Sequence, residues 1–380
     1  MKGSLQVKSN KYYAVFRIDG KTKWHSLGIE AKRGNKRKAE FAMTELITKY
    51  CENPNLFNKI QFANYIKEWL VCVKKQVDII TYEGYRQYAE RHIIPYFEEK
   101  NIMLQDVRIQ DVESYYNYKS ITGRLDGKEG GLSPRTIKLH AIVLNLVFKR
   151  AICEGLIERN PCDYAKIPKS RSTKSVANFY TAEECKQLLK IVENTPLYDM
   201  IYITVIYGLR RSELMGLKWD AIDFENDTVT VKHTVVLNSN IVEKKDTTKN
   251  KTSMRTYPLL PDVKEILIRI KTDQEKNKKL FGNCYVKTDY VFTREDGSCY
   301  YPSYPTEMLT KYLKKNKMPH IRWHDLRHSC ASILIVKGWH MKDISEWLGH
   351  SDIGTTMNIY GHISIAHKRE ISCTLRGLLE

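Results

Sequence analysis

The chain has 380 residues, 42% of them hydrophobic, which predicts about two or three folded domains. A formal charge of +18 favours a polyanionic partner, because such a field mainly attracts and steers opposite charge. No apolar run is long enough to span a bilayer, MKGSLQVKSNK lacks the pattern of a signal peptide, and the nine cysteines form no CxxC pair. We therefore expect a cytoplasmic, reduced protein without membrane contact.

The first 50 residues are the most basic part, with twelve Lys or Arg against four Asp or Glu. Apolar and polar residues alternate over residues 11–18 and 23–27, and the Asp-Gly dipeptide between them is a strong hairpin signal. We predict a three-stranded sheet followed by a helix over residues 36–50. The sheet could lie in a DNA groove, or be a solvated meander whose aromatic side chains pack on the helix. The candidate DNA contacts are Tyr12, Arg17, Lys21 and Trp24.

A helical region follows a linker at residues 51–59. Apolar residues recur at i, i+3 and i+4 over residues 62–70, and further helices are predicted over 81–94, where Pro95 would end the helix, and over 109–118. Ser133 as N-cap begins a helix that reaches about residue 153. Candidate phosphate contacts here are Thr81, Tyr85, Arg86 and Arg135, although a core position explains each aromatic side chain at least as well.

Residues 160–175 hold two prolines and several cations and predict a basic interdomain linker, in which Lys169 and Arg171 are candidate DNA contacts. A capping box beginning at Thr181 opens the last region. Helices are predicted to about residue 217, and later elements follow in order. These are β-rich runs over 228–236 and 256–260, a helix over 263–277, a strand over 289–292 and a helix over 304–315.

The strongest chemical signal lies near the end of the chain. His324 and Arg327 stand at i and i+3 in IRWHDLRH and share a face if the segment is helical. A helix predicted over residues 342–348 ends at a glycine, which puts His350 on a turn, and Tyr360 follows ten residues later. The arginine fork matches two phosphate oxygens, and a tyrosine becomes a useful nucleophile once cations neutralise the phosphate. The pattern predicts attack on a phosphodiester.

A second arginine appears upstream, where the apolar run IYITVIY meets Gly208 and Arg210 stands in place of a core residue. Glu213, three residues later, could orient its guanidinium. The segment TKNKTSMR at residues 248–255 lies between β-rich runs and predicts the tip or return of a hairpin. A lysine from this hairpin could reach into a cleft and protonate the leaving 5′ oxygen.

The series GLRRSEL, TKNKTSMRTYPL, HDLRH and LGHSDIGTTMNIY resembles the tyrosine recombinases, specifically the integrases of phages and conjugative transposons. The order and spacing match over roughly the last half of the chain, which makes the resemblance highly specific. It implies a catalytic set without metal or cofactor: Arg210, Lys249, His324, Arg327, His350 and Tyr360, supported by Glu213 and Lys251. The family's spacing selects Arg210 rather than Arg211, whereas Lys249 and Lys251 both fit the hairpin and Lys249 is preferred.

The resemblance also implies a multidomain, mainly α fold with small β elements. An arm-type DNA-binding domain of a three-stranded sheet plus helix would span 1–52, an all-helical core-binding domain 58–165, and a mixed α/β catalytic domain 175–380. The implied function is site-specific recombination through a 3′-phosphotyrosine, which integrates and excises a mobile genetic element. The implied partners are double-stranded DNA, a homotetramer on that DNA, and an accessory excision or DNA-bending protein.

Several alternatives stay open. An apolar stripe in residues 363–380 predicts a tail helix that docks on a neighbouring protomer or, alternatively, on its own domain. A non-catalytic DNA-binding regulator would be expected to have lost part of the catalytic set. A type IB topoisomerase shares the chemistry, but the basic sheet and the apolar tail favour an integrase. Zinc at His324 and His328 is disfavoured because HExxH sites place a glutamate between the histidines, whereas this sequence has Asp325, Leu326 and Arg327 there, and an arginine beside a metal is electrostatically unfavourable.

Overall fold

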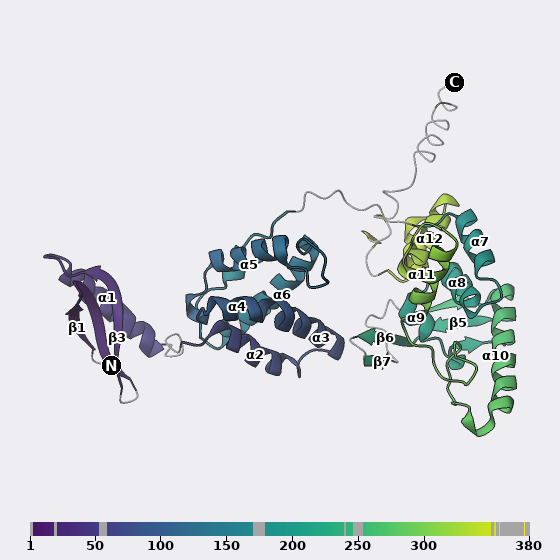
Figure 1. Ribbon diagram of the computed structural model, residues 1–380, viewed down its shortest axis with the longest axis horizontal. Helices are drawn as coiled ribbons and strands as arrows, with labels where there is room; N and C mark the ends of the chain where they lie inside the picture. Colours follow the sequence, from purple (N-terminus) through teal and green to yellow (C-terminus); the bar gives the residue numbers. More distant parts are fainter. Residues whose placement is uncertain are drawn as a thin grey trace. The chain divides into compact units, whose positions relative to one another are not determined.

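The computed structural model describes residues 3–18, 21–52, 59–169, 179–238, 241–245 and 254–350, together with Ile353, Gly354, Met357 and Arg376. The chain divides into two compact units, residues 1–172 and 173–380 (Figure 1). In the described ranges, no helix combines the length and apolarity that crossing a membrane requires.

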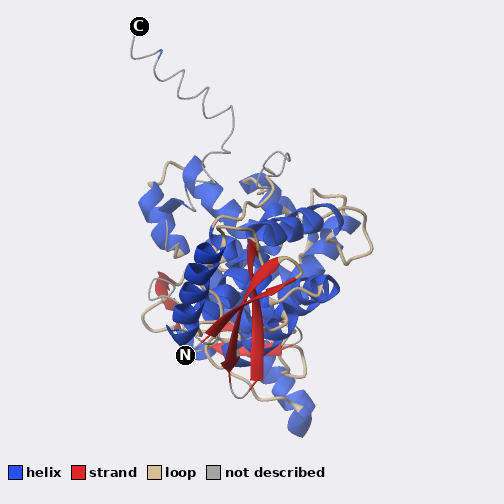
Figure 2. Ribbon diagram, turned by 90° about the vertical axis from the view of Figure 1, so that its left-hand side faces the viewer, coloured by secondary structure: helices blue, strands red, loops and turns tan. Residues whose placement is uncertain are grey.

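The first unit begins with the predicted sheet and helix, which the structure confirms. Strands β1 (Gly3–Lys8), β2 (Lys11–Ile18) and β3 (Lys21–Glu30) are antiparallel in that order, and helix α1 (Lys36–Glu52) follows. The strands are red at the front of Figure 2. Ala14 and Phe16 are buried with Tyr50 of α1, so apolar residues of the central strand form a small core with the helix.

The rest of the first unit is helical, as predicted. Its helices are α2 (Phe62–Val73), α3 (Ile79–Tyr88), a π-helical turn (Ala89–Ile93), α4 (Ile94–Lys100), α5 (Ile109–Thr122) and α6 (Pro134–Cys153). Their core includes the stacked rings of Phe62 and Phe148, whose centroids are 4.8 Å apart. The predicted N-cap of α6 is confirmed, because the Ser133 hydroxyl accepts a hydrogen bond from the Thr136 amide at 3.2 Å.

One boundary in this region was predicted wrongly. Pro95 does not end a helix; it lies in the first turn of α4, directly after the π-helical turn. The missing N–H of a proline costs nothing at a helix start, and the wider π turn lets the chain continue from α3 into α4 without a loop. The helical path therefore extends to Lys100.

The second unit surrounds one large core. The capping box at Thr181 is confirmed at the start of α7. The helices are α7 (Ala182–Ile191), α8 (Pro196–Tyr207), α9 (Arg211–Met215), α10 (Pro261–Phe281), α11 (Tyr304–Lys315), α12 (Trp323–Val336) and α13 (Met341–Leu348). The strands are β4 (Ile222–Asp223), β5 (Thr228–Val231) and β8 (Arg255–Pro258) in one sheet, and β6 (Thr234–Asn238) and β7 (Ile241–Lys245) in another. Helix α10 lies along one side of the first sheet (Figure 1).

In this unit one predicted β-rich run is divided between two sheets, and one predicted strand was wrong. Residues 228–236 form two strands of different sheets, because the chain leaves the ladder at Lys232 and His233, and the buried His233 ring meets the Tyr290 hydroxyl at 2.9 Å. Residues 289–292 form only an isolated bridge at Tyr290. The Gln274 side-chain amide donates to the carbonyls of Tyr290 and Val291, at 3.1 and 2.9 Å, so a helix side chain replaces the partners that a neighbouring strand would supply.

The end of α8 meets the end of α13 at close range. Gly208 has φ +61°, and a Cβ added there would lie 2.2 Å from the Leu348 side chain and 3.5 Å from the Cys330 sulfur of α12. A glycine is required by both the left-handed backbone and the space. The C-terminal ends of α8 and α13 therefore meet against α12 at one point, where the candidate chemical residues lie.

Candidate active site

Arg327 is the centre of this junction. It lies one turn into α12 and its side chain is fully buried. Its Nη1 donates to the Gly208 carbonyl at 2.6 Å and its Nη2 to the Leu348 carbonyl at 2.5 Å. Burial, followed by the charge of Arg210, lowers the pKa of Arg327 to about 9. A buried cation held by neutral carbonyls leaves the site with unneutralised positive charge, which favours an anionic ligand.

Arg210 approaches the same point from the other side. It is the residue before α9, and its Nη2 donates to the Gly349 carbonyl at 3.0 Å, one residue beyond the carbonyl that Arg327 contacts. Its Nη1 pairs with Glu213 Oε1 at 2.6 Å. The predicted orientation of Arg210 by Glu213 is therefore present, and one third of the Arg210 side chain (33%) is exposed to solvent.

Arg211 points elsewhere, although it is adjacent in sequence. Its Nη1 donates to the Thr306 hydroxyl of α11 at 3.1 Å. The turn before α9 thus separates the two arginines, and of the two it is Arg210 whose guanidinium contacts the end of α13 beside Arg327.

Sequence reasoning missed Arg255 and Tyr257 of β8. The Arg255 guanidinium, only 8% exposed, makes a two-pronged ion pair with Glu213, with Nη1–Oε1 at 3.1 Å and Nη2–Oε2 at 2.7 Å. The Tyr257 hydroxyl lies against the Tyr207 carbonyl at 3.1 Å and against the Trp347 carbonyl. The alternation of Arg255 and Tyr257 puts both on one side of β8, but this pattern does not identify Glu213 as the partner of Arg255.

The histidines complete the cluster. His324 and His328 of α12 lie one turn apart, with ring centroids 4.8 Å apart. His350 follows the C-cap Gly349, where its amide donates to the Ser345 carbonyl at 2.9 Å, so it lies on the predicted turn. Burial and the nearby cations lower the pKa of His350 to about 3 and that of His324 to about 4. Both rings are neutral at pH 7 in the free protein.

The electrostatics of this group suit a phosphodiester. Arg210 and Arg327 donate to the backbone of residues 348–349 beside the neutral rings of His324 and His350, and the Glu213 carboxylate is already engaged by two guanidinium groups. Although burial alone would raise it, the ion pairs with Arg255 and then Arg210 hold the pKa of Glu213 at about 2. An anion would find hydrogen-bond donors and net positive charge that increase in strength as charge develops on its oxygens.

Several predicted site residues cannot be placed. Lys249, Lys251, Tyr360, Arg171, the side chain of Lys21 and the tail helix lie outside the described residues. Arg135 and Lys169 are exposed, as is Arg17 of the sheet, and Trp24 is 47% exposed with the Lys8 ammonium 5.9 Å from its ring. Tyr12 is half-buried.

Three predicted DNA contacts of α3 have partners inside the protein. The Thr81 hydroxyl donates to Asp78 at 2.9 Å, the Tyr85 ring packs 5.9 Å from Trp69, and Arg86 pairs with Glu83 at 2.7 Å. These contacts account for the three residues structurally. Any phosphate contact by Arg86 has to compete with a carboxylate.

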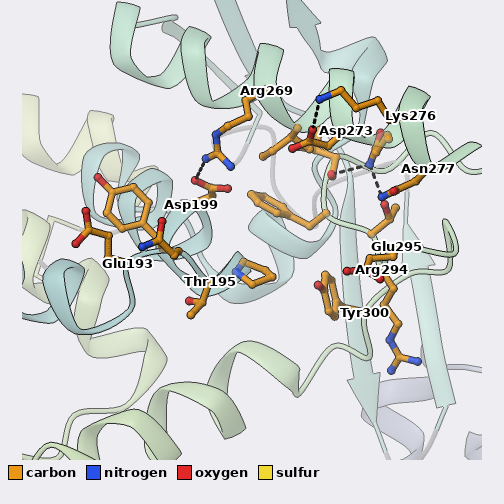
Figure 3. Close-up of a pocket in the computed structure, with 18 residues that line it drawn as sticks. Glu193, Thr195, Asp199, Arg269, Asp273, Lys276, Asn277, Arg294, Glu295 and Tyr300 are labelled. Atoms are coloured by element: carbon orange, nitrogen blue, oxygen red, sulfur yellow. Dashed lines mark hydrogen bonds and ion pairs between the residues drawn. The ribbon is translucent and has the colours of Figure 1, made fainter. Parts of the chain in front are cut away.

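A separate cavity of about 850 Å³ lies in the second unit between α8, α10 and residues 291–300 (Figure 3). Four of its charged residues form ion pairs: Arg269 with the buried Asp199 at 2.5 Å, and Lys276 with Asp273 at 3.2 Å. It contains none of the residues predicted to act on a phosphate, so it is distinct from the arginine and histidine cluster. Within the described ranges, no group of three or more His, Cys, Asp or Glu could hold a metal ion.

Comparisons with known proteins give two family matches and several similar proteins. Residues 178–367 match the model of the phage integrase family, and residues 61–120 match that of a phage integrase N-terminal SAM-like domain. A protein named tyrosine recombinase XerC-like, from Caldanaerobacter subterraneus subsp. tengcongensis, is 29% identical and covers 90% of each chain. The ICEBs1 integrase of Bacillus subtilis is 27% identical, covering 84% of each chain.

The fold is also similar to a solved structure. The Tn1549 transposon integrase in complex with transposon right end DNA has a TM-score of 0.64 and 20% sequence identity, covering 83% of this chain and 100% of that chain. At that identity the similarity concerns the fold.

Proposed function

Because this chain belongs to the phage integrase family and is a site-specific tyrosine recombinase, we propose that it cuts and rejoins the ends of a mobile genetic element with Tyr360 as nucleophile. The observation that supports this most is the meeting of Arg210 and Arg327 at consecutive carbonyls, those of Gly349 and Leu348, immediately before His350. Two guanidinium forks at one point match the four or five oxygens of a phosphate under attack.

The proposed reaction balances without a cofactor. The Tyr360 hydroxyl gives up its proton to solvent as its oxygen attacks the scissile phosphorus, a 3′-phosphotyrosine bond forms, and the bond to the 5′ oxygen breaks. Arg210 and Arg327 stabilise the non-bridging oxygens with His324 and His350, and Lys249 gives a proton to the leaving oxygen. Because the phosphotyrosine keeps the energy of the phosphodiester, the 5′-hydroxyl of a partner strand can reverse the step and join to it without ATP or metal. Exchange of one strand of each duplex gives a Holliday junction. The same cleavage and rejoining on the second strands then resolves that junction.

The rest of the chain would bring DNA to this site. We assign residues 1–52 to arm-type sites and residues 58–165 to the core site, with the catalytic domain at 175–380. Phosphate attraction by exposed cations such as Arg135 and Lys169 would supply most of the affinity. Four protomers would hold two duplexes in the cytoplasm, each tail helix docking on a neighbour, and an accessory protein would select excision.

The experiment that tests this proposal is adduct formation on candidate element ends. Duplexes nicked beside the cleavage point lose the short product strand, which traps the covalent intermediate. Incubation in EDTA should give a protein–DNA adduct on a denaturing gel, and peptide mapping should place the DNA on Tyr360. Tight binding without an adduct on any end, or an adduct on another residue, would contradict the proposal.

The choice between Lys249 and Lys251 has its own test. A 5′-bridging phosphorothiolate substrate releases a thiolate, which needs no proton. We expect Lys249→Ala to cleave the normal phosphodiester about 100-fold or more slowly and to recover on the sulfur substrate, because general acid catalysis is worth about 10² to 10⁴ in rate. Lys251→Ala should respond equally to both substrates. Recovery of the Lys251 variant instead would exchange the two roles.

A further inference from the structure

Glu213 is shared between two arginines that come from distant parts of the chain. Its Oε1 accepts from Arg210 Nη1 at 2.6 Å and from Arg255 Nη1 at 3.1 Å. Its Oε2 accepts from the Arg210 amide at 2.9 Å and from Arg255 Nη2 at 2.7 Å. The carboxylate is only 2% exposed, so its position is determined by these four donors. Arg255 thus holds the Glu213 carboxylate in place, and this carboxylate in turn orients the Arg210 guanidinium.

Arg255 also reaches the last turn of α13, through Tyr257. Arg255 Nε donates to the Tyr257 hydroxyl, which in turn contacts the carbonyl of Trp347. Leu348 and Gly349, the next two residues, present the carbonyls that Arg327 and Arg210 hold. Strand β8 therefore reaches both arginines, one through Glu213 and one through the last turn of α13.

We propose that Arg255 is a positioning residue for strand cleavage: it sets the Arg210 guanidinium through Glu213 and the carbonyls of residues 347–349 through Tyr257. The Nε, Nη1 and Nη2 of Arg255 all donate within the protein, to Tyr257 and to Glu213, so we assign it no DNA contact. The inference rests on the proposed function, in which Arg210 acts on the phosphate.

Removal of Arg255 should make cleavage sensitive to acid through Glu213. With both arginines present, the pKa of Glu213 is about 2 in spite of burial, so the carboxylate stays charged at every working pH. Without Arg255, burial is opposed only by the backbone amide and charge of Arg210 and by the charge of Arg327, and the pKa of Glu213 rises. A protonated Glu213 would hold Arg210 less firmly, so the variant should lose activity as the pH falls through that raised pKa.

The experiment measures single-turnover cleavage of the nicked duplex from about pH 5.5 to 8.5, the range in which an added acid limb is visible. We expect Arg255→Ala to cleave about 100-fold more slowly at neutral pH, the cost of a small misplacement, while DNA affinity is unchanged. An acid limb absent from the wild type should appear. The double variant Arg255→Ala/Glu213→Gln should lack that limb, because an amide does not titrate.

Arg255→Lys and Arg269→Ala are the comparison variants. Arg255→Lys, which keeps the charge but not the fork, should recover part of the rate and lose most of the limb. Arg269→Ala removes another arginine paired with a buried carboxylate of the same unit and should cleave like the wild type. If Arg255→Ala does not fold, Arg255→Lys decides, and wild-type rates with a wild-type profile would overturn the proposal.

Two other results would reject the role of Arg255 and the proposed function, respectively. A slow Arg255→Ala whose pH profile runs parallel to that of the wild type would show a merely structural residue and overturn the inference. No cleavage by the wild-type chain itself would instead reject the proposed function, so the two failures are distinguishable.

Discussion

Tyr360→Phe is expected to bind its DNA site with wild-type affinity and to form no covalent adduct. The substitution removes one oxygen atom, and with it the only nucleophile in the proposed mechanism. Affinity should survive because it is spread over many phosphate contacts. We expect cleavage to fall by at least about 10⁴-fold, as when an enzyme loses its nucleophile. Denaturing gels measure the adduct, and mobility shifts measure binding on the same nicked duplex.

The matched control is Tyr301→Phe. Tyr301 is an exposed tyrosine of the second unit, 40% accessible, and it takes no part in the contacts around Arg327. It should give wild-type amounts of adduct. An adduct that persists in a clean preparation of Tyr360→Phe would reject the assignment of the nucleophile, whichever residue carried it.

Much of the candidate site could be predicted because its signals are local. His324 and Arg327 share a helix face through a spacing of three residues, and the glycine after residues 342–348 is the left-handed C-cap that turns the chain toward His350. The hydrogen bond between Arg210 and Glu213 is likewise an i, i+3 contact. Short-range rules of helix geometry suffice for each of these.

Arg255 could not be predicted in the same way. Its partner Glu213 is 42 residues away, and only the pairing of β5 with β8 and the packing of α9 bring them together. The strand predicted at residues 289–292 failed for a related reason. Its carbonyls are satisfied by Gln274 from α10, a tertiary contact that no local pattern records. The helix end predicted before Pro95 was wrong because a π-helical turn places this proline in the first turn of α4.

The second large effect is expected at Arg327. Arg327→Lys keeps the positive charge, but one ammonium cannot reproduce two diverging N–H groups that hold the Gly208 and Leu348 carbonyls. We expect cleavage to fall by about 10² to 10³-fold, the usual cost of losing one preorganised donor to an oxyanion. Stability should fall by about 1 to 3 kcal/mol, because a buried carbonyl loses its partner. Thermal unfolding and single-turnover cleavage measure the two losses.

Arg210→Lys is the matched comparison, and the contrast identifies the physical role of each arginine. Arg210 is one third exposed (33%), and water can replace its contact with the Gly349 carbonyl. It should therefore lose cleavage with a smaller loss of unfolding free energy than Arg327→Lys, because Arg255 still pairs with Glu213. Equal losses of stability in the two variants would contradict this division. Because burial disfavours the charge of Arg327 in the free protein, a bound phosphate should stabilise the wild type more than Arg327→Lys, whose single ammonium cannot hold both carbonyls and also donate to the anion.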